Sequence, residues 1–187
     1  MNARPGHFVL ELKCVLGAPR EQIFRTLTEP AELAKWWGPH GFTTPEIDLD
    51  LRIGGGYRFT MQPPDGDLFH LSGEFLEIDP PSRLAYTFRW EEPDPDDRTT
   101  VVTLSLEDIE DATEVSLAQG EFATEARLAL HRSGWTDGLE KLRELVESGL
   151  FGQATSRTRT GDAGRARSEP PAATAVAAPS PALRPRP

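Results

Sequence analysis

The chain has 187 residues, a formal net charge of −10 and a single cysteine, so we expect one folded domain and exclude a disulfide framework. Residues 1–151 hold 14 basic and 28 acidic residues, whereas residues 152–187 hold six arginines against Asp162 and Glu169. Nucleic-acid binding needs clustered Lys and Arg, which such an acidic domain lacks.

The first predicted elements are one strand and two short helices. Residues 8–16 alternate as a strand does, with one face formed by Phe8, Leu10, Leu12 and Cys14. Cys14 is interpreted as a small buried hydrophobe. Pro19 suits the first turn of a helix that carries Ile23, Phe24 and Leu27. Pro30 disfavours helix at Glu29 and so ends that helix, and a second short helix is predicted over Ala31–Trp37, with Leu33, Trp36 and Trp37.

Residues 43–122 show the pattern of strands joined by turns. Tyr57, Phe59 and Met61 share one face of a strand, and Gly73 inside the next strand predicts a bulge or a close approach. The residues Leu84, Tyr86, Phe88 and Trp90 alternate with smaller or polar ones, which predicts a strand with one aromatic face. Gly54-Gly55-Gly56 precedes no helix, so it is interpreted as a turn and not as a phosphate cradle.

Residues 122–149 predict one long amphipathic helix. Its apolar stripe contains Leu128, His131, Trp135, Leu139, Leu142, Leu145 and Val146. Gly149 suits a helix C-terminus, and Gly134 and Gly138 flank Trp135. The element order strand, two helices, six strands and one helix predicts an α+β fold in which the long helix covers a curved antiparallel sheet of about seven strands.

We expect residues 8–149 to form the domain and residues 150–187 to form a disordered tail rich in Ala, Pro and Arg, because residues 152–187 hold too few large apolar side chains for a core. The tail is interpreted as a solubilising linker, with contact to RNA or to the acidic domain as alternatives. No apolar run is long enough to cross a membrane and no secretory signal is present, so we expect no membrane insertion and a cytoplasmic protein.

The chain resembles the SRPBCC superfamily, whose START-like or Bet v 1-like fold is called helix-grip. Within it, the chain is similar to the branch named for activators of the ninety-kilodalton heat-shock chaperone's ATPase. The similar segments are Ala18–Phe24, Pro30–Gly38, Arg52–Phe59, Gly73–Thr87, Ala112–Leu117 and Gly134–Leu142.

That resemblance implies a helix-grip fold and binding of lipids, polyketides or other small apolar ligands, while a few family members are cyclases or hydrolases. The cochaperones that gave the branch its name also need a separate N-terminal domain. Only seven residues precede the first predicted strand here, so we expect that domain to be missing and do not carry the name over as a function.

A cavity between the sheet and the long helix is the predicted site, with a volume of roughly 300–1,000 Å³. Its predicted lining is Trp36, Trp37, Phe59, Met61, Tyr86, Phe88, Trp90, His131, Trp135 and Gly138. The favoured hypothesis is a non-catalytic binder of a small hydrophobic or amphipathic molecule, with no cofactor.

Two alternatives stay open at this point: a cyclase- or hydrolase-like enzyme and a protein-interaction module of cochaperone type. No catalytic residue is assigned, and the polar candidates are His131, Glu74 and Arg58. The histidines His7, His40, His70 and His131 are scattered, without an i,i+4 pair, so no metal site is predicted.

Overall fold

The structure is a computed structural model that describes residues 8–151. Its elements follow the predicted order: β1 (Phe8–Leu16), α1 (Arg20–Thr28), α2 (Pro30–Trp36), β2 (Thr43–Leu49), β3 (Gly56–Gln62), β4 (Phe69–Asp79), β5 (Arg83–Trp90), β6 (Thr100–Ile109), β7 (Ala112–Phe122) and α3 (Glu125–Ser148). The α+β helix-grip architecture is confirmed. Among the described residues, none of the helices has the length and apolar character needed to cross a bilayer.

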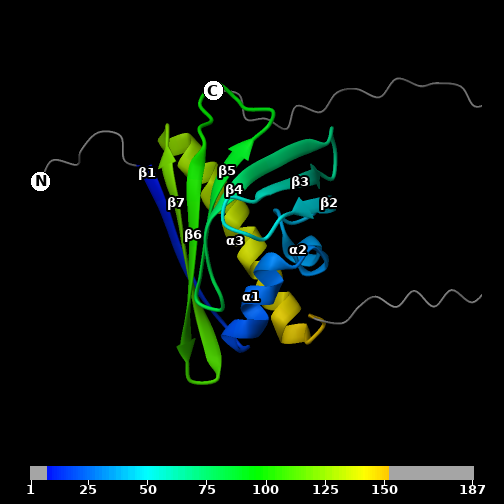
Figure 1. The fold of residues 1–187 in the computed structure, drawn as a ribbon. Helices are drawn as coiled ribbons and strands as arrows, with labels where there is room; N and C mark the ends of the chain where they lie inside the picture. Colours follow the sequence, from blue (N-terminus) through cyan, green and yellow to red (C-terminus); the bar gives the residue numbers. More distant parts are fainter. Residues whose placement is uncertain (1–7, 152–187) are drawn as a thin grey trace, which may run out of the picture.

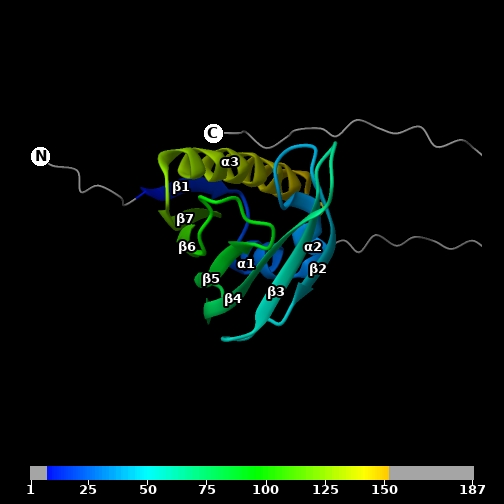
Figure 2. The ribbon, with the colours of Figure 1, turned by 90° about the horizontal axis from the view of Figure 1, so that it is seen from above.

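The seven strands form one antiparallel sheet in the order β1-β7-β6-β5-β4-β3-β2. The sheet curves around α1 and α2, and α3 runs along its concave side (Figure 1). Seen from above, α3 extends from β1 on one side to α2 and β2 on the other (Figure 2). The strands β1 and β2 are therefore the two edges, and the helices lie between them.

The ends of α3 are set by local chemistry. Thr124 is the N-cap, and its side chain accepts a hydrogen bond from the backbone N–H of Arg127. Phe122 still belongs to β7, so the helix begins three residues later than its predicted range. Gly149 ends the helix in the left-handed conformation, with φ of 66°, which glycine adopts without steric cost.

The core differs in composition across the sheet. Below α3, the strands β1, β6 and β7 contribute fully buried aliphatic side chains, among them Leu10, Leu104 and Leu117, and Leu142 of α3 packs into the same core. Under α1 and α2, the strands β3, β4 and β5 contribute aromatic side chains instead. The first half is a conventional aliphatic core, and the second half contains the candidate site.

The described part of the chain continues two residues past the predicted end of the domain. Phe151 is half-buried and packs against the core, and the carbonyl of Leu150 accepts a hydrogen bond from Lys35. The rest of the predicted tail, residues 152–187, lies outside the described residues.

Candidate functional site

An apolar pocket lies between the helical segment and the aromatic half of the sheet. Its lining divides into two groups of four. Leu27, Leu33, Trp37 and Leu49 come from the segment that runs from α1 to β2, and Tyr57, Phe59, Phe75 and Tyr86 come from β3, β4 and β5. The pocket thus lies between the helices α1 and α2 and the end of the sheet that β2 to β5 form.

The aromatic side chains of this pocket pack edge-on and tilted against one another. The ring centroid of Trp37 lies 5.0 Å from that of Phe59, and the Tyr57 ring lies 5.4 Å from the Tyr86 ring and 5.6 Å from the Phe75 ring. These distances are typical of favourable aromatic pairs. The rings therefore fill most of the space that they surround.

The remaining space has a volume of about 10 Å³, roughly the room needed for one water molecule. This pocket is therefore much smaller than the predicted cavity of several hundred cubic ångströms. The physical reason is that the predicted lining residues are large and face one another. They fill by mutual contact the volume that the strand pattern alone suggested would be empty.

Tyr57 reaches across the sheet because Gly73 has no side chain. Its hydroxyl donates a hydrogen bond of 2.6 Å to the backbone carbonyl of Thr87. A Cβ at position 73 would lie 1.9 Å from that same carbonyl oxygen and 2.6 Å from the Tyr57 ring. Gly73 is thus the close approach that its place within a strand predicted.

Tyr86 differs from Tyr57 in its hydrogen bonding. It is 5% exposed and lines the pocket, and its hydroxyl has no hydrogen-bond partner among residues 8–151. Burial raises the pKa of both phenols well above the ordinary value, so each stays neutral and can donate a hydrogen bond. The Tyr86 hydroxyl can therefore donate a hydrogen bond to a polar group of a ligand in this pocket.

Trp36, Trp135 and Gly138 lie beside the pocket but do not line it. The indole N–H of Trp36 donates to the carbonyl of Thr26, and a Cβ at Gly138 would be in ordinary contact with the Trp36 ring at 3.8 Å. The indole N–H of Trp135 donates to the side-chain oxygen of Gln119 at 2.7 Å. These three positions serve packing between α2, α3 and β7, and the space expected at Gly138 holds the Trp36 ring.

His131 lies in a separate aromatic cluster near the N-terminal end of α3. Its ring is 4.7 Å from the Phe122 ring, 5.2 Å from the Phe88 ring and 6.0 Å from the Trp90 ring. Burial, and secondarily the positive charge of Arg127, lower the pKa of His131 from 6.5 to about 4. His131 is therefore a neutral, buried ring at physiological pH.

The sequence of residues 17–147 matches the family model described as Activator of Hsp90 ATPase homolog 1-like protein. The chain belongs to this family. A protein from Chromobacterium violaceum is 28% identical, with a TM-score of 0.69 over 74% of this chain and 96% of that one. A protein from Nitrosomonas europaea is 29% identical, with a TM-score of 0.65 over 76% of this chain and 96% of that one.

A further solved structure carries the family name in its own description. The AHSA1 protein from Silicibacter pomeroyi is 27% identical, with a TM-score of 0.64 over 76% of this chain and 98% of that one. None of the curated proteins matches the chain. Membership in the Activator of Hsp90 ATPase homolog 1-like family thus agrees with the resemblance seen in the sequence segments, and it fixes the fold without naming a ligand.

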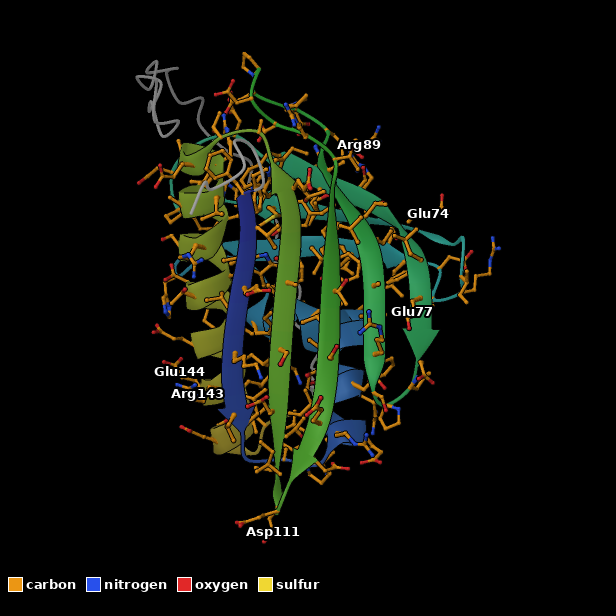
Figure 3. All side chains as sticks on the ribbon, turned by 90° about the vertical axis from the view of Figure 1, so that its left-hand side faces the viewer. Glu74, Glu77, Arg89, Asp111, Arg143 and Glu144 are labelled. Atoms are coloured by element: carbon orange, nitrogen blue, oxygen red, sulfur yellow. The ribbon has the colours of Figure 1, made fainter. Side chains whose placement is uncertain are left out.

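The predicted polar candidates do not come together in this family member. Glu74 is exposed on the outer side of the sheet, away from the helices, as Figure 3 shows. Arg58 is also exposed and forms a bidentate ion pair with Glu91, at 2.9 Å for the shortest contact. Neither side chain meets His131, so the three candidates do not form one catalytic centre.

Of the ten residues predicted to line the cavity, the pocket includes Trp37, Phe59 and Tyr86. The others form the Trp36–Gly138 contact, the His131 cluster or the surrounding core, which also includes the buried Met61. Sequence analysis did not assign Tyr57, Phe75, Leu27, Leu33 and Leu49 to the site. The alternation of β3 places Tyr57 on the same face as Phe59, so that pattern could have identified it.

A larger hollow of about 170 Å³ lies beside α1 and α2, lined by Gln22, Arg25, Thr26, Glu32 and Phe151. The carboxylate of Glu32 is paired with Lys35 at 2.9 Å. None of the predicted site residues lines this hollow, whereas three of them line the smaller apolar pocket.

Proposed function

We propose that this domain binds a small hydrophobic or amphipathic molecule in the apolar pocket between the segment α1–α2–β2 and strands β3–β5. The observation that carries the proposal is Tyr86, a buried residue that lines an otherwise apolar pocket and whose hydroxyl makes no hydrogen bond to another described residue. One polar group among apolar walls is the usual composition of a small-molecule site.

Binding requires the pocket to enlarge, and the topology supplies a way to do so. The strand β2 is an edge strand that pairs only with β3. The loop before it contains Gly38 and Gly41, both with positive φ, of 89° and 82°. A ligand that separates the helical segment from the sheet would take over the apolar contacts that the two groups of lining residues now make with each other.

The pocket supports binding better than acid–base catalysis. Among residues 8–151, no carboxylate or imidazole lines it. Its two phenols are held neutral by burial, because both pKa values are raised. The aromatic and aliphatic side chains that remain offer apolar contact area and a single hydrogen-bond donor, which suits a ligand with an apolar body and one acceptor group.

A fluorescence titration tests the proposal. Trp37 lines the pocket, so we expect dodecanoic acid and 1-anilinonaphthalene-8-sulfonate each to change tryptophan emission saturably and to compete with each other. Leu49→Phe adds bulk at a half-buried lining position and should weaken both affinities at least tenfold. Ile47→Phe is the matched control, since Ile47 is half-buried on the same face of β2 and does not line the pocket.

The polar contact is tested separately. Tyr86→Phe removes only the hydroxyl, and we expect it to weaken dodecanoic acid binding about fivefold, the effect of one net hydrogen bond. Emission changes that do not saturate, or equal effects of Leu49→Phe and Ile47→Phe, would rule out ligand binding in this pocket. In that case a protein-binding role, as the family name suggests for its namesake, becomes the leading hypothesis.

A further inference from the structure

His40, Asp137 and Glu140 come together on the surface beside the pocket. His40 lies in the loop between α2 and β2, and the two carboxylates lie one turn apart on α3. Their possible ligand atoms all lie within 4.8 Å of one another. The Nε2 atom of His40 is 3.3 Å from a carboxylate oxygen of Glu140, and the backbone N–H of His40 points to Asp137 at 3.3 Å.

The loop and the helix that hold these three residues are fixed relative to each other. The Lys141 ammonium group reaches the carbonyl oxygens of Trp37, Gly38 and Pro39, at 3.4, 3.2 and 3.4 Å. Lys141 follows Glu140 directly, and Pro39 precedes His40. The three ligand groups are therefore positioned by an existing contact between the loop and α3, which lowers the ordering cost of binding an ion.

The ligand set suits a divalent transition-metal cation. One imidazole and two carboxylates offer nitrogen and oxygen ligands, which zinc accepts at about 2.0–2.2 Å in tetrahedral geometry. Two ligands of a tetrahedral zinc ion lie about 3.4 Å apart on those bond lengths. The 3.3 Å separation between the His40 and Glu140 atoms matches that spacing without rearrangement.

Charge and exposure agree with this assignment. Asp137 and Glu140 stand at i and i+3 on α3, where like charges repel, and a cation between them would remove that repulsion. His40 and Glu140 are exposed and Asp137 is half-buried, so water can complete the coordination shell. We propose that His40, Asp137 and Glu140 form a zinc-type divalent cation site that fastens the loop between α2 and β2 to α3.

A second cluster of one histidine and two carboxylates provides an internal comparison. His70 lies with Glu91 and Glu92, and its Nδ1 atom is already 2.7 Å from Glu92. Arg58 contacts both carboxylate oxygens of Glu91, so a cation there would have to displace a bidentate ion pair. Asp137 and Glu140 form no direct ion pair with an arginine or lysine side chain in the described part of the chain, and the nearby Lys141 ammonium group donates to backbone carbonyls while interacting with Asp137 through space. The first cluster is therefore the better cation site.

The test uses the full chain after removal of metals by chelation and needs no knowledge of the apolar ligand. Calorimetric titration with Zn²⁺ should show one saturable site per chain, and the melting temperature should rise by several degrees once Zn²⁺ reaches about a hundred times its dissociation constant. His40→Ala and Glu140→Gln should each weaken binding at least tenfold, whereas His70→Ala should leave it unchanged.

All three substitutions are at surface positions or in surface ion pairs, so circular dichroism should show folded protein in each case. Cobalt(II) provides an independent signal. Its tetrahedral absorption bands should persist in His70→Ala and disappear in His40→Ala, which would identify the His40 imidazole as a ligand. Absence of saturable Zn²⁺ binding, or loss of binding in His70→Ala with retention in His40→Ala, would overturn the proposal.

Discussion

The two halves of this sheet bury different kinds of side chain. Under α3, the strands β1, β6 and β7 pack Leu10, Leu104 and Leu117 against Leu142, and each of these is at most 2% exposed. Under α1 and α2, the strands β3 to β5 pack aromatic rings around a small space that Tyr86 also lines. Branched aliphatic side chains interdigitate closely, whereas the facing aromatic rings leave a small space between them. The first half is therefore a conventional aliphatic core, and the second contains the ligand site that we propose.

The largest stability effect should come from the aliphatic half. Leu142→Ala removes a fully buried side chain from α3 and should lower the free energy of unfolding by about 2–5 kcal/mol. Urea denaturation measures this change. Leu130→Ala on the same helix is the control, because Leu130 is 43% exposed and a surface substitution should cost less than about 0.5 kcal/mol. Equal effects of the two substitutions would show that this face of α3 does not bury Leu142.

The aromatic cluster around His131 predicts a pH dependence. Because the folded-state pKa of about 4 lies below the unfolded value of 6.5, the unfolded state takes up the proton first as the pH falls. The contribution of His131 to the free energy of unfolding should therefore be constant above about pH 6.5, decrease between pH 6.5 and 4, and level off below pH 4. The expected loss from this residue is about 3 kcal/mol.

The difference between the wild-type protein and His131→Phe isolates this contribution, since the two proteins share every other ionisable group, including the nearby ion pairs of Arg127 with Asp94 and Asp97. Thermal unfolding at several pH values gives both curves. The variant should lose less stability on acidification than the wild type. Parallel curves would mean that His131 titrates normally in the folded protein.

The two pocket tyrosines provide a smaller and sharper comparison. Tyr57→Phe removes the hydroxyl that bonds the Thr87 carbonyl and should cost about 1 kcal/mol. Tyr86→Phe removes a hydroxyl without a partner among the described residues, so it should be neutral or slightly stabilising. Denaturation of both variants measures the difference. A loss for Tyr86→Phe equal to that for Tyr57→Phe would show that the Tyr86 hydroxyl is already satisfied in the free protein.

The fold could be predicted from the sequence because the patterns that specify its strands and helices lie within short segments of the chain. Alternation in the range Leu84 to Trp90 predicted β5, and the apolar spacing through Trp135 and Leu142 predicted α3. Gly73 was also predicted correctly as a close approach, because a glycine within a strand restricts what can pack there. These patterns depend on neighbours within a few residues.

The site could be predicted only in part, because its geometry depends on contacts between distant segments. Periodicity placed Trp37 and Tyr86 on buried faces, but it could not show that the facing rings would fill the cavity. The proximity of His40 to Asp137 and Glu140 could not be predicted for the same reason, since His40 is about a hundred residues from the two carboxylates in the chain and no local spacing links them. Glu74 and His131 share no local pattern, and the structure places them on different sides of the sheet.

The most direct test of the difference between the two halves is a nuclear magnetic resonance titration of the isotope-labelled chain with dodecanoic acid. We predict that saturable amide shifts concentrate in α1, α2, β2 and strands β3 to β5, around Trp37, Tyr57 and Tyr86. The amides of β6, β7 and the Leu142 turn of α3 should change little. Shifts centred on β6 and β7, or no saturable shifts at all, would contradict the assignment of ligand binding to the aromatic half.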